Sequence, residues 1–235
     1  MIDVDRQEEP IPAQKVTPSI RWFYWVRRPR PWRINLLEKM FEKDCIKGEI
    51  VFPRHLEETK NGKKTGRVWE PTRYSFANRD LYYKYKRCLS EPVGIAKGEN
   101  GCQVPVWEQR SRRALELVSE TMVYNDKNEV FFSEKTYKAI RAGQLFLILG
   151  HTGSIRELKK LGFKVFDEYL DHSYDACEKL EDRIELLSTE LKRINDMSDN
   201  EFDKIWQATY QDRLHNQTHL KRKFKFWKKH TSGLI

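Results

Sequence analysis

The sequence predicts an α/β protein with a parallel β-sheet, and three observations support this fold class. In the second half of the chain, short apolar runs of strand length alternate with segments of helical spacing. The connections between them are short, as in units whose parallel strands are joined by a helix. The run at residues 145–149 is entirely apolar, which is typical of a strand buried on both faces. We therefore expect a parallel sheet with helices on both faces.

The first half of the chain begins with an aromatic and β-branched segment at residues 22–26, which predicts a buried strand. Pro29 and Pro31 end this strand, and the spacing of apolar residues predicts a helix over 32–41. The remaining expectations are a short strand at 50–52, a loop or hairpin at 57–69, a helix at 80–89 and a junction at 92–105, where three glycines and two prolines gather.

The second half gives clearer signals. Residues 114–124 predict a strand that ends near Glu120. Ser133 is a good N-cap, and Glu134 lies in the first turn of a helix that reaches about residue 142. The later expectations are strands at 145–149 and 163–166, a turn at 150–154, helices at 155–161 and 176–194, and a closing helix or helix pair from 200 to about 227.

The charge balance favours an anionic partner. The 235 residues include 44 basic and 35 acidic side chains, a net charge of +9. Much of the excess lies in two runs without acids, at residues 21–33 and 221–229. Nucleic acid, nucleotide phosphates and an acidic protein surface all fit this pattern.

Other compositional features exclude several classes of protein. The longest apolar run, at 145–149, is far shorter than the roughly 20 residues that cross a bilayer, so no membrane association is expected. Residues 1–9 lack the apolar core of a signal peptide, and we expect an intracellular protein. The four cysteines are scattered without ligand spacing, so no metal site is expected.

Two segments of the second half have residue types that suit an anion. Gly150, Gly153 and Ser154 lie in a turn between a strand and a helix, where backbone N–H groups can approach phosphate. The alternative is a plain turn. Lys135 and Lys138 lie on one side of a helix, and a lysine in the first turn opposes the helix dipole unless it serves an anion. The alternative there is a cap with solvated lysines.

The two basic runs give further candidates. Prolines hold the segment after the first strand extended, which pre-places its guanidinium groups for phosphate, although a basic surface loop would look the same. The run at 221–229 interleaves basic and aromatic residues, which suits single-stranded nucleic acid, an acidic partner or a helix that covers the core. The candidate phosphate-binding arginines are Arg27, Arg28, Arg30 and Arg33.

Three stretches together resemble a known family. Residues 25–33 (WVRRPRPWR), 119–121 (SET) and 132–140 (FSEKTYKAI) are similar to segments of bacteriophage-encoded glycosyltransferase-like proteins. Residues 147–150, 162–167 and 173–175, and Arg183, continue the likeness. The central stretch also resembles that of fucosyltransferases, in which a glutamate and a basic residue bind the sugar nucleotide.

The resemblance implies a two-lobed glycosyltransferase B-like fold, a nucleotide sugar as substrate, and no metal or other cofactor. By this analogy Glu134 contacts the ribose or sugar of the donor, and Glu120 lies at the cleft as the candidate base. Lys135 and Lys138 face the diphosphate together with Gly150, Gly153 and Ser154. The implied organisation is a flexible arm at 1–19, a reduced N-terminal α/β lobe at 20–105, a nucleotide-binding lobe at 106–196 and a C-terminal helix with a basic tail at 197–235.

Two functions stay open. The first is a glycosyltransferase of the phage-infected host cytoplasm that moves a sugar from a nucleotide sugar to an unknown acceptor. The second is a catalytically inactive protein of this fold that binds nucleic acid or a virion partner. The family usually has Asn, His and Pro where this chain has Val26, Trp32 and Ala139. The loss of the polar pair favours the second function, and the retained Glu134 and Lys135 favour the first.

Overall fold

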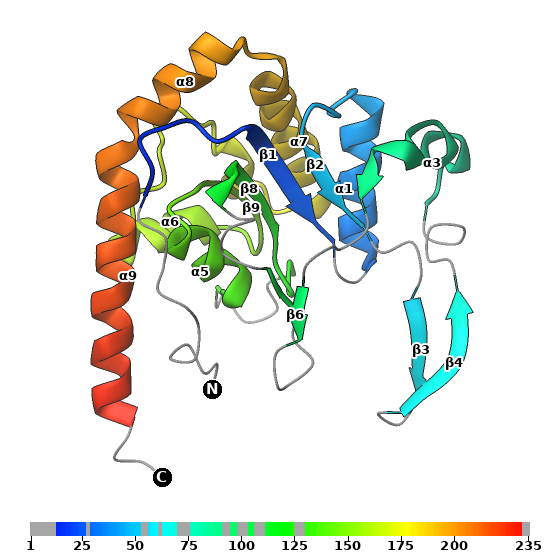
Figure 1. Cartoon of the computed structure of the whole chain (residues 1–235), viewed down its shortest axis with the longest axis horizontal. Helices are drawn as coiled ribbons and strands as arrows, with labels where there is room; N and C mark the ends of the chain where they lie inside the picture. Colours follow the sequence, from blue (N-terminus) through cyan, green and yellow to red (C-terminus); the bar gives the residue numbers. More distant parts are fainter. Residues whose placement is uncertain are drawn as a thin grey trace.

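The protein is built around one parallel β-sheet covered by helices (Figure 1). The computed structural model describes residues 13–26, 29–52, 56–60, 63–69, 76–90, 95–97, 103–105, 111–124 and 130–231. The 5-stranded sheet has the order β5-β2-β1-β8-β9. Its strands are β1 (Ile20–Trp25), β2 (Glu49–Val51), β5 (Leu89–Ser90), β8 (Arg113–Ser119) and β9 (Leu145–Leu149).

The strand order is that of a doubly wound sheet. The chain starts at β1 in the middle, moves outward to β2 and β5, and then returns to the other side of β1 to form β8 and β9. The order therefore reverses between β1 and β8, where Tyr24 lies opposite Leu117. In sheets of this kind, ligands bind outside the carboxyl ends of the strands at this switch point.

Helices cover both faces of the sheet. The helix α1 (Pro31–Glu42) packs against α7 (Leu180–Asp196) on one face. The helix α5 (Glu134–Arg141) joins β8 to β9 and packs against α9 (Tyr210–Thr231). Right-handed crossovers that run in opposite directions from the centre place α1 and α5 on opposite faces. The other helices are α3 (Arg79–Tyr85), α6 (Ser154–Lys160) and α8 (Asp199–Ala208), with short 3-10 turns at Lys86–Cys88 and Ser173–Ala176.

Two hairpins interrupt the sheet connections. The first pairs β3 (Leu56–Lys60) with β4 (Lys63–Trp69), and the second pairs β6 (Ile95–Lys97) with β7 (Gln103–Pro105). Each follows the carboxyl end of a sheet strand, β2 or β5. No helix in the described part of the chain is long and apolar enough to cross a membrane.

Most of the expected elements are present. The strands at 22–26, 50–52, 114–124 and 145–149 and the helices at 32–41, 133–142 and 155–161 match elements within a few residues. The segment at 57–69 is a hairpin, and the closing segment is a helix pair, α8 and α9. The helix expected at 176–194 begins at Leu180, because residues 173–176 form a separate turn. The parallel sheet is confirmed, since every pair in the central sheet is parallel.

The structure does not confirm the division into two lobes at residue 105. Strands β1 and β2 from the first half and β8 and β9 from the second half belong to one sheet. Every residue of β8 and β9 is buried, so an edge of β8 left without β1 would expose apolar strand surface and unpaired backbone groups. Pairing with β1 buries this apolar surface and gives the backbone groups of β8 their hydrogen-bond partners.

The strand expected at 163–166 is wrong. This segment has no strand partner, and the side chain of Asn216 on α9 serves as its neighbour instead. The amide of Asn216 accepts a hydrogen bond from Lys164 N at 2.8 Å and donates one to Lys164 O at 2.7 Å. Phe163, Val165 and Phe166 are buried, so the apolar pattern reflects burial rather than β pairing.

The arm expected to be flexible at 1–19 is fixed where the structure describes it. Ala13 N donates to the side chain of Gln217 at 2.8 Å, and Trp206 Nε1 donates to Val16 O at 3.0 Å. Ala13 is buried. Residues 13–17 therefore pack along α8 and α9, and residues 1–12 lie outside the described part of the chain.

Candidate anion-binding site

Four basic side chains converge on the segment that follows β8, at the switch point of the sheet. Arg30 Nη1 donates to Thr121 O at 3.0 Å, and Arg33 Nη2 donates to Ser119 O at 3.2 Å. Lys135 Nζ donates to Thr121 Oγ1 at 2.9 Å. Arg183 Nη2 donates to Val123 O at 2.9 Å. We call these four residues the cationic cluster: Arg30, Arg33, Lys135 and Arg183.

The start of α1 places two of these cations. Pro31 occupies the first turn of α1, where its missing N–H costs nothing, and Arg30 is the N-cap in extended conformation. The guanidinium of Arg30 lies over the ring of Trp32, 5.2 Å from its centroid. Arg33 is only 3% exposed, and burial lowers the pKa of its guanidinium, which stays charged at neutral pH. Both arginines are thus held rigidly.

Arg183 is a further candidate for anion binding, and the sequence did not indicate this role. It comes from the first turns of α7, is 3% exposed, and also donates to Gly150 O. Among the described residues it has no ion-pair partner, and its Nε has no hydrogen-bond partner. Burial lowers the pKa of its guanidinium. The charge of Asp175 favours the protonated guanidinium but makes no ion pair with it, so an anion bound beside Arg183 would stabilise the buried cation further.

The first turn of α5 places Lys135 as the sequence predicts. Ser133 is the N-cap, and its Oγ accepts a hydrogen bond from Lys135 N. Lys135 Nζ also lies 3.5 Å from Glu134 Oε1. Burial alone would raise the pKa of Glu134, but the charges of Lys135 and Lys138 and a backbone hydrogen bond lower it below its usual value. Glu134 is therefore an ionised, half-buried carboxylate beside the cationic cluster, with Lys138 half-buried one turn further on.

Glu120 lies beneath this turn rather than in an open cleft. Its side chain is fully buried, and its carboxylate accepts hydrogen bonds from Ser133 N at 3.1 Å and Thr136 Oγ1 at 2.6 Å. Ser133 Oγ and Thr121 N also donate to it. A general base must reach the proton that it abstracts, and these bonds commit both oxygens. The geometry supports a role in which Glu120 joins the end of β8 to the start of α5.

The N–H groups of residues 153–156, at the start of α6, are occupied. Ile155 N and Arg156 N donate to the Asp175 carboxylate at 2.9 and 3.1 Å, and Gly153 N donates to Asp175 O at 2.8 Å. This carboxylate takes the position at the start of α6 where a phosphate was expected. Gly153 has a φ of +82°, which favours glycine, and the geometry supports the plain-turn alternative.

The other residues of this turn also serve its shape. Ser154 is fully buried and donates to His151 O at 2.7 Å. A side chain at Gly150 would come within 2.7 Å of Ser154 Oγ. Arg27 and Arg28, the remaining candidates for phosphate binding, lie outside the described residues.

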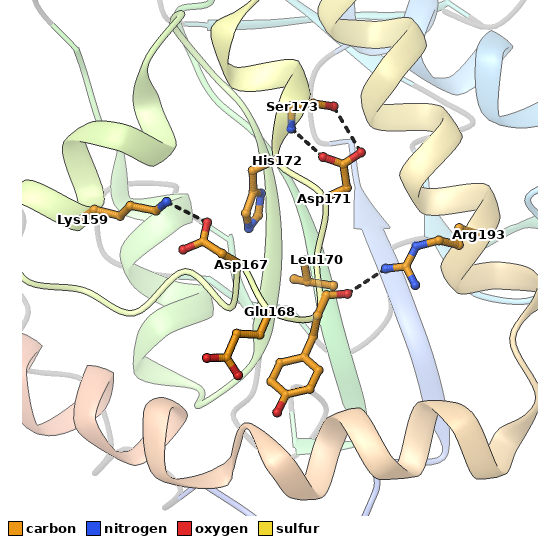
Figure 2. Close-up of a pocket in the computed structure, with 9 residues that line it drawn as sticks. Lys159, Asp167, Glu168, Leu170, Asp171, His172, Ser173 and Arg193 are labelled. Carbon is orange, nitrogen blue, oxygen red and sulfur yellow. Dashed lines mark hydrogen bonds and ion pairs between the residues drawn. The ribbon is translucent and has the colours of Figure 1, made fainter.

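A separate hollow of about 600 Å³ lies near the opposite end of α7 (Figure 2). Arg193 lines it, ten residues beyond Arg183, which is roughly 15 Å along a helix. Two of its three acids are already bonded: Asp167 pairs with Lys159 at 2.7 Å, and Asp171 accepts from Ser173 N at 2.8 Å. Acids outnumber cations along its wall, so this hollow is a poor site for phosphate.

The fold and the site together define an α/β protein with a doubly wound parallel sheet and a cationic cluster at its switch point. No protein-family model, no curated protein and no solved structure matches the chain. Within the described ranges there is no group of three or more His, Cys, Asp or Glu side chains that could hold a metal ion.

Proposed function

We propose that the protein binds a nucleotide sugar at the cationic cluster and acts as a glycosyltransferase-like protein. The observation that carries this proposal is the convergence of Arg30, Arg33, Lys135 and Arg183 at the point where doubly wound sheets bind ligands. Glycosyl transfer from a nucleotide sugar releases a diphosphate, and fixed cations stabilise the charge that develops on it.

The proposed roles follow from position and charge. Lys135 and Arg183 contact the diphosphate, since one is a half-buried ammonium and the other is a buried guanidinium without a paired acid. The ionised Glu134 accepts hydrogen bonds from hydroxyl groups of the ribose or sugar. Glu120 holds the first turn of α5 in place.

Binding is tested by thermal denaturation with nucleoside diphosphates and sugar nucleotides. A ligand that binds only the folded state at about a hundred times its Kd stabilises it by roughly 2.7 kcal/mol, so the melting temperature should rise. The rise should disappear in Lys135→Ala. It should persist in Lys159→Ala, which removes an exposed lysine of α6 that pairs with Asp167. The absence of any shift at millimolar ligand would overturn the proposal.

Catalysis is tested separately by release of the nucleoside diphosphate from a sugar nucleotide that binds. Release that requires both Glu134 and Lys135 would support a transferase or hydrolase. Tight binding without release, in the presence of varied glycan and nucleic-acid acceptors, would instead support the inactive alternative that keeps the fold and the ligand site.

A further inference from the structure

Aromatic and apolar side chains are exposed directly beside the cationic cluster. Tyr124 is 57% exposed, Met122 is 49% exposed and Phe131 is 44% exposed. They lie on the two segments that leave β8 and enter α5, which also carry the partners of Lys135. Trp32, on the first turn of α1, is half-buried next to them. Large exposed apolar side chains that gather in one place indicate a contact surface.

The rings are held in a defined arrangement. Trp32 and Tyr124 meet edge to face, with centroids 6.4 Å apart and an interplanar angle of 85°. Trp32 Nε1 donates to Glu120 O at 3.3 Å, which fixes the indole, and the guanidinium of Arg30 lies over the same ring. We call Trp32 and Tyr124 the aromatic platform.

Stacking surfaces beside cations are the chemistry that recognises single-stranded nucleic acid. Every base has a face that can stack on an aromatic side chain, and the phosphates that flank it are attracted by Lys and Arg. A neutral glycan can also pack on aromatic rings, but it carries no charge for the cationic cluster to attract, and Arg30 and Lys135 of that cluster are partly exposed. The charge of the site therefore favours nucleic acid over a neutral glycan.

We infer that this edge of the sheet binds single-stranded nucleic acid, with a base stacked on the aromatic platform and phosphates on the cationic cluster. The inference does not depend on sugar transfer. The two proposals fail independently, because the test below uses no sugar nucleotide.

The test measures fluorescence anisotropy of a short labelled oligothymidylate at several salt concentrations. The logarithm of the wild-type association constant should fall linearly with the logarithm of the salt concentration. Tyr124→Ala should weaken binding roughly tenfold while leaving the salt slope unchanged, because it removes stacking and no phosphate contact. Lys135→Gln, which removes one cation of the cluster, should reduce the slope by about one.

A matched control is Tyr83→Ala. Tyr83 lies on α3 and is 55% exposed. The next two residues, Lys84 and Tyr85, contact Asp44, which follows the carboxyl end of α1. The cationic cluster lies at the opposite end of α1. This variant should bind like the wild type, and melting temperatures should confirm that each variant is folded. Absence of binding at low salt, equal affinities for Tyr124→Ala and Tyr83→Ala, or tighter binding of duplex than of single strand would each overturn the inference.

Discussion

Two buried arginines differ in how completely the fold uses their guanidinium groups. Arg213 on α9 is fully buried, stacks on Trp206 with 3.4 Å to the ring centroid, and burial lowers its pKa to about 10. It donates to Gly143 O, Gln14 O and Trp206 O, so each of its nitrogens is used within the fold. Arg183 keeps its Nε unbonded among the described residues and lies at the switch point.

Because of this difference, we expect substitution of Arg213 to reduce stability most and substitution of Arg183 to reduce ligand binding most. Arg213→Leu should lower the free energy of unfolding by about 3 kcal/mol, since the buried carbonyls of Gly143 and Trp206 and the partly buried carbonyl of Gln14 lose their donor. Arg183→Leu should abolish stabilisation by a nucleotide ligand at a smaller cost in stability. Urea denaturation with and without ligand measures both effects. Equal ligand-dependent stabilisation in Arg183→Leu and the wild type would remove Arg183 from the site.

Glu120 is expected to stabilise the fold. Because its carboxylate accepts four hydrogen bonds at the start of α5, Glu120→Ala should reduce the free energy of unfolding by about 3 kcal/mol. Thermal denaturation measures the change. A variant that melts like the wild type and loses only activity would show that Glu120 acts in catalysis instead.

His172 links stability to pH. Its Nε2 bonds to Val165 O at 2.6 Å and its Nδ1 to Tyr174 Oη at 3.0 Å. Burial lowers the pKa of His172 below 6.5 and outweighs nearby acids that favour protonation. The folded protein therefore binds fewer protons than the unfolded chain, and this contribution to stability is present above pH 6.5 and lost as the pH falls below it.

The prediction is a loss of stability in the wild type between about pH 6.5 and pH 5 that His172→Gln lacks. Urea denaturation across this range measures the slope. Parallel curves for the two proteins would mean that other groups control the acid response.

Among the elements, α9 holds the segment at 163–166 through one side chain. Asn216 is 1% exposed and bonds both backbone groups of Lys164. Nearby, His219 bonds to Leu161 O at 2.7 Å. The segment at 163–166 therefore depends on α9 for its conformation.

Asn216→Leu should destabilise the protein by about 2 kcal/mol, because it leaves the partly buried N–H and C=O groups of Lys164 without partners. Hydrogen exchange should speed up at Lys164 N before it changes in β8 or β9. Unchanged protection at Lys164 would show that the segment holds its conformation without α9.

At the scale of the whole molecule, one sheet joins both halves of the chain. Strand β1 lies between β2 and β8, so neither half can form its sheet alone. We expect a single cooperative unfolding transition, with tryptophan fluorescence and far-ultraviolet circular dichroism changing together in urea. The fragment 106–235 should remain largely unfolded. Two separate transitions, or a folded fragment, would support independent lobes.

The positions of most helices and strands, and the net positive charge, could be predicted from the sequence alone. Apolar runs set the strands β1, β8 and β9, and the Ser133 cap with Glu134 set the start of α5. These signals are local, because they depend on periodicity, on capping and on proline. The Glu134–Lys135 pair of the candidate site could be found in the same way.

Which elements pair or pack with one another could be learned only from the tertiary structure. No local signal could show that β1 pairs with β8, that Asp175 fills the anion position at the start of α6, or that Arg183 comes to the switch point from α7. These outcomes join residues far apart in sequence, and they are fixed by burial of apolar surface and by the need to satisfy every buried polar group. The same requirement committed Glu120 to the fold, although its sequence position gave it the appearance of a catalytic base.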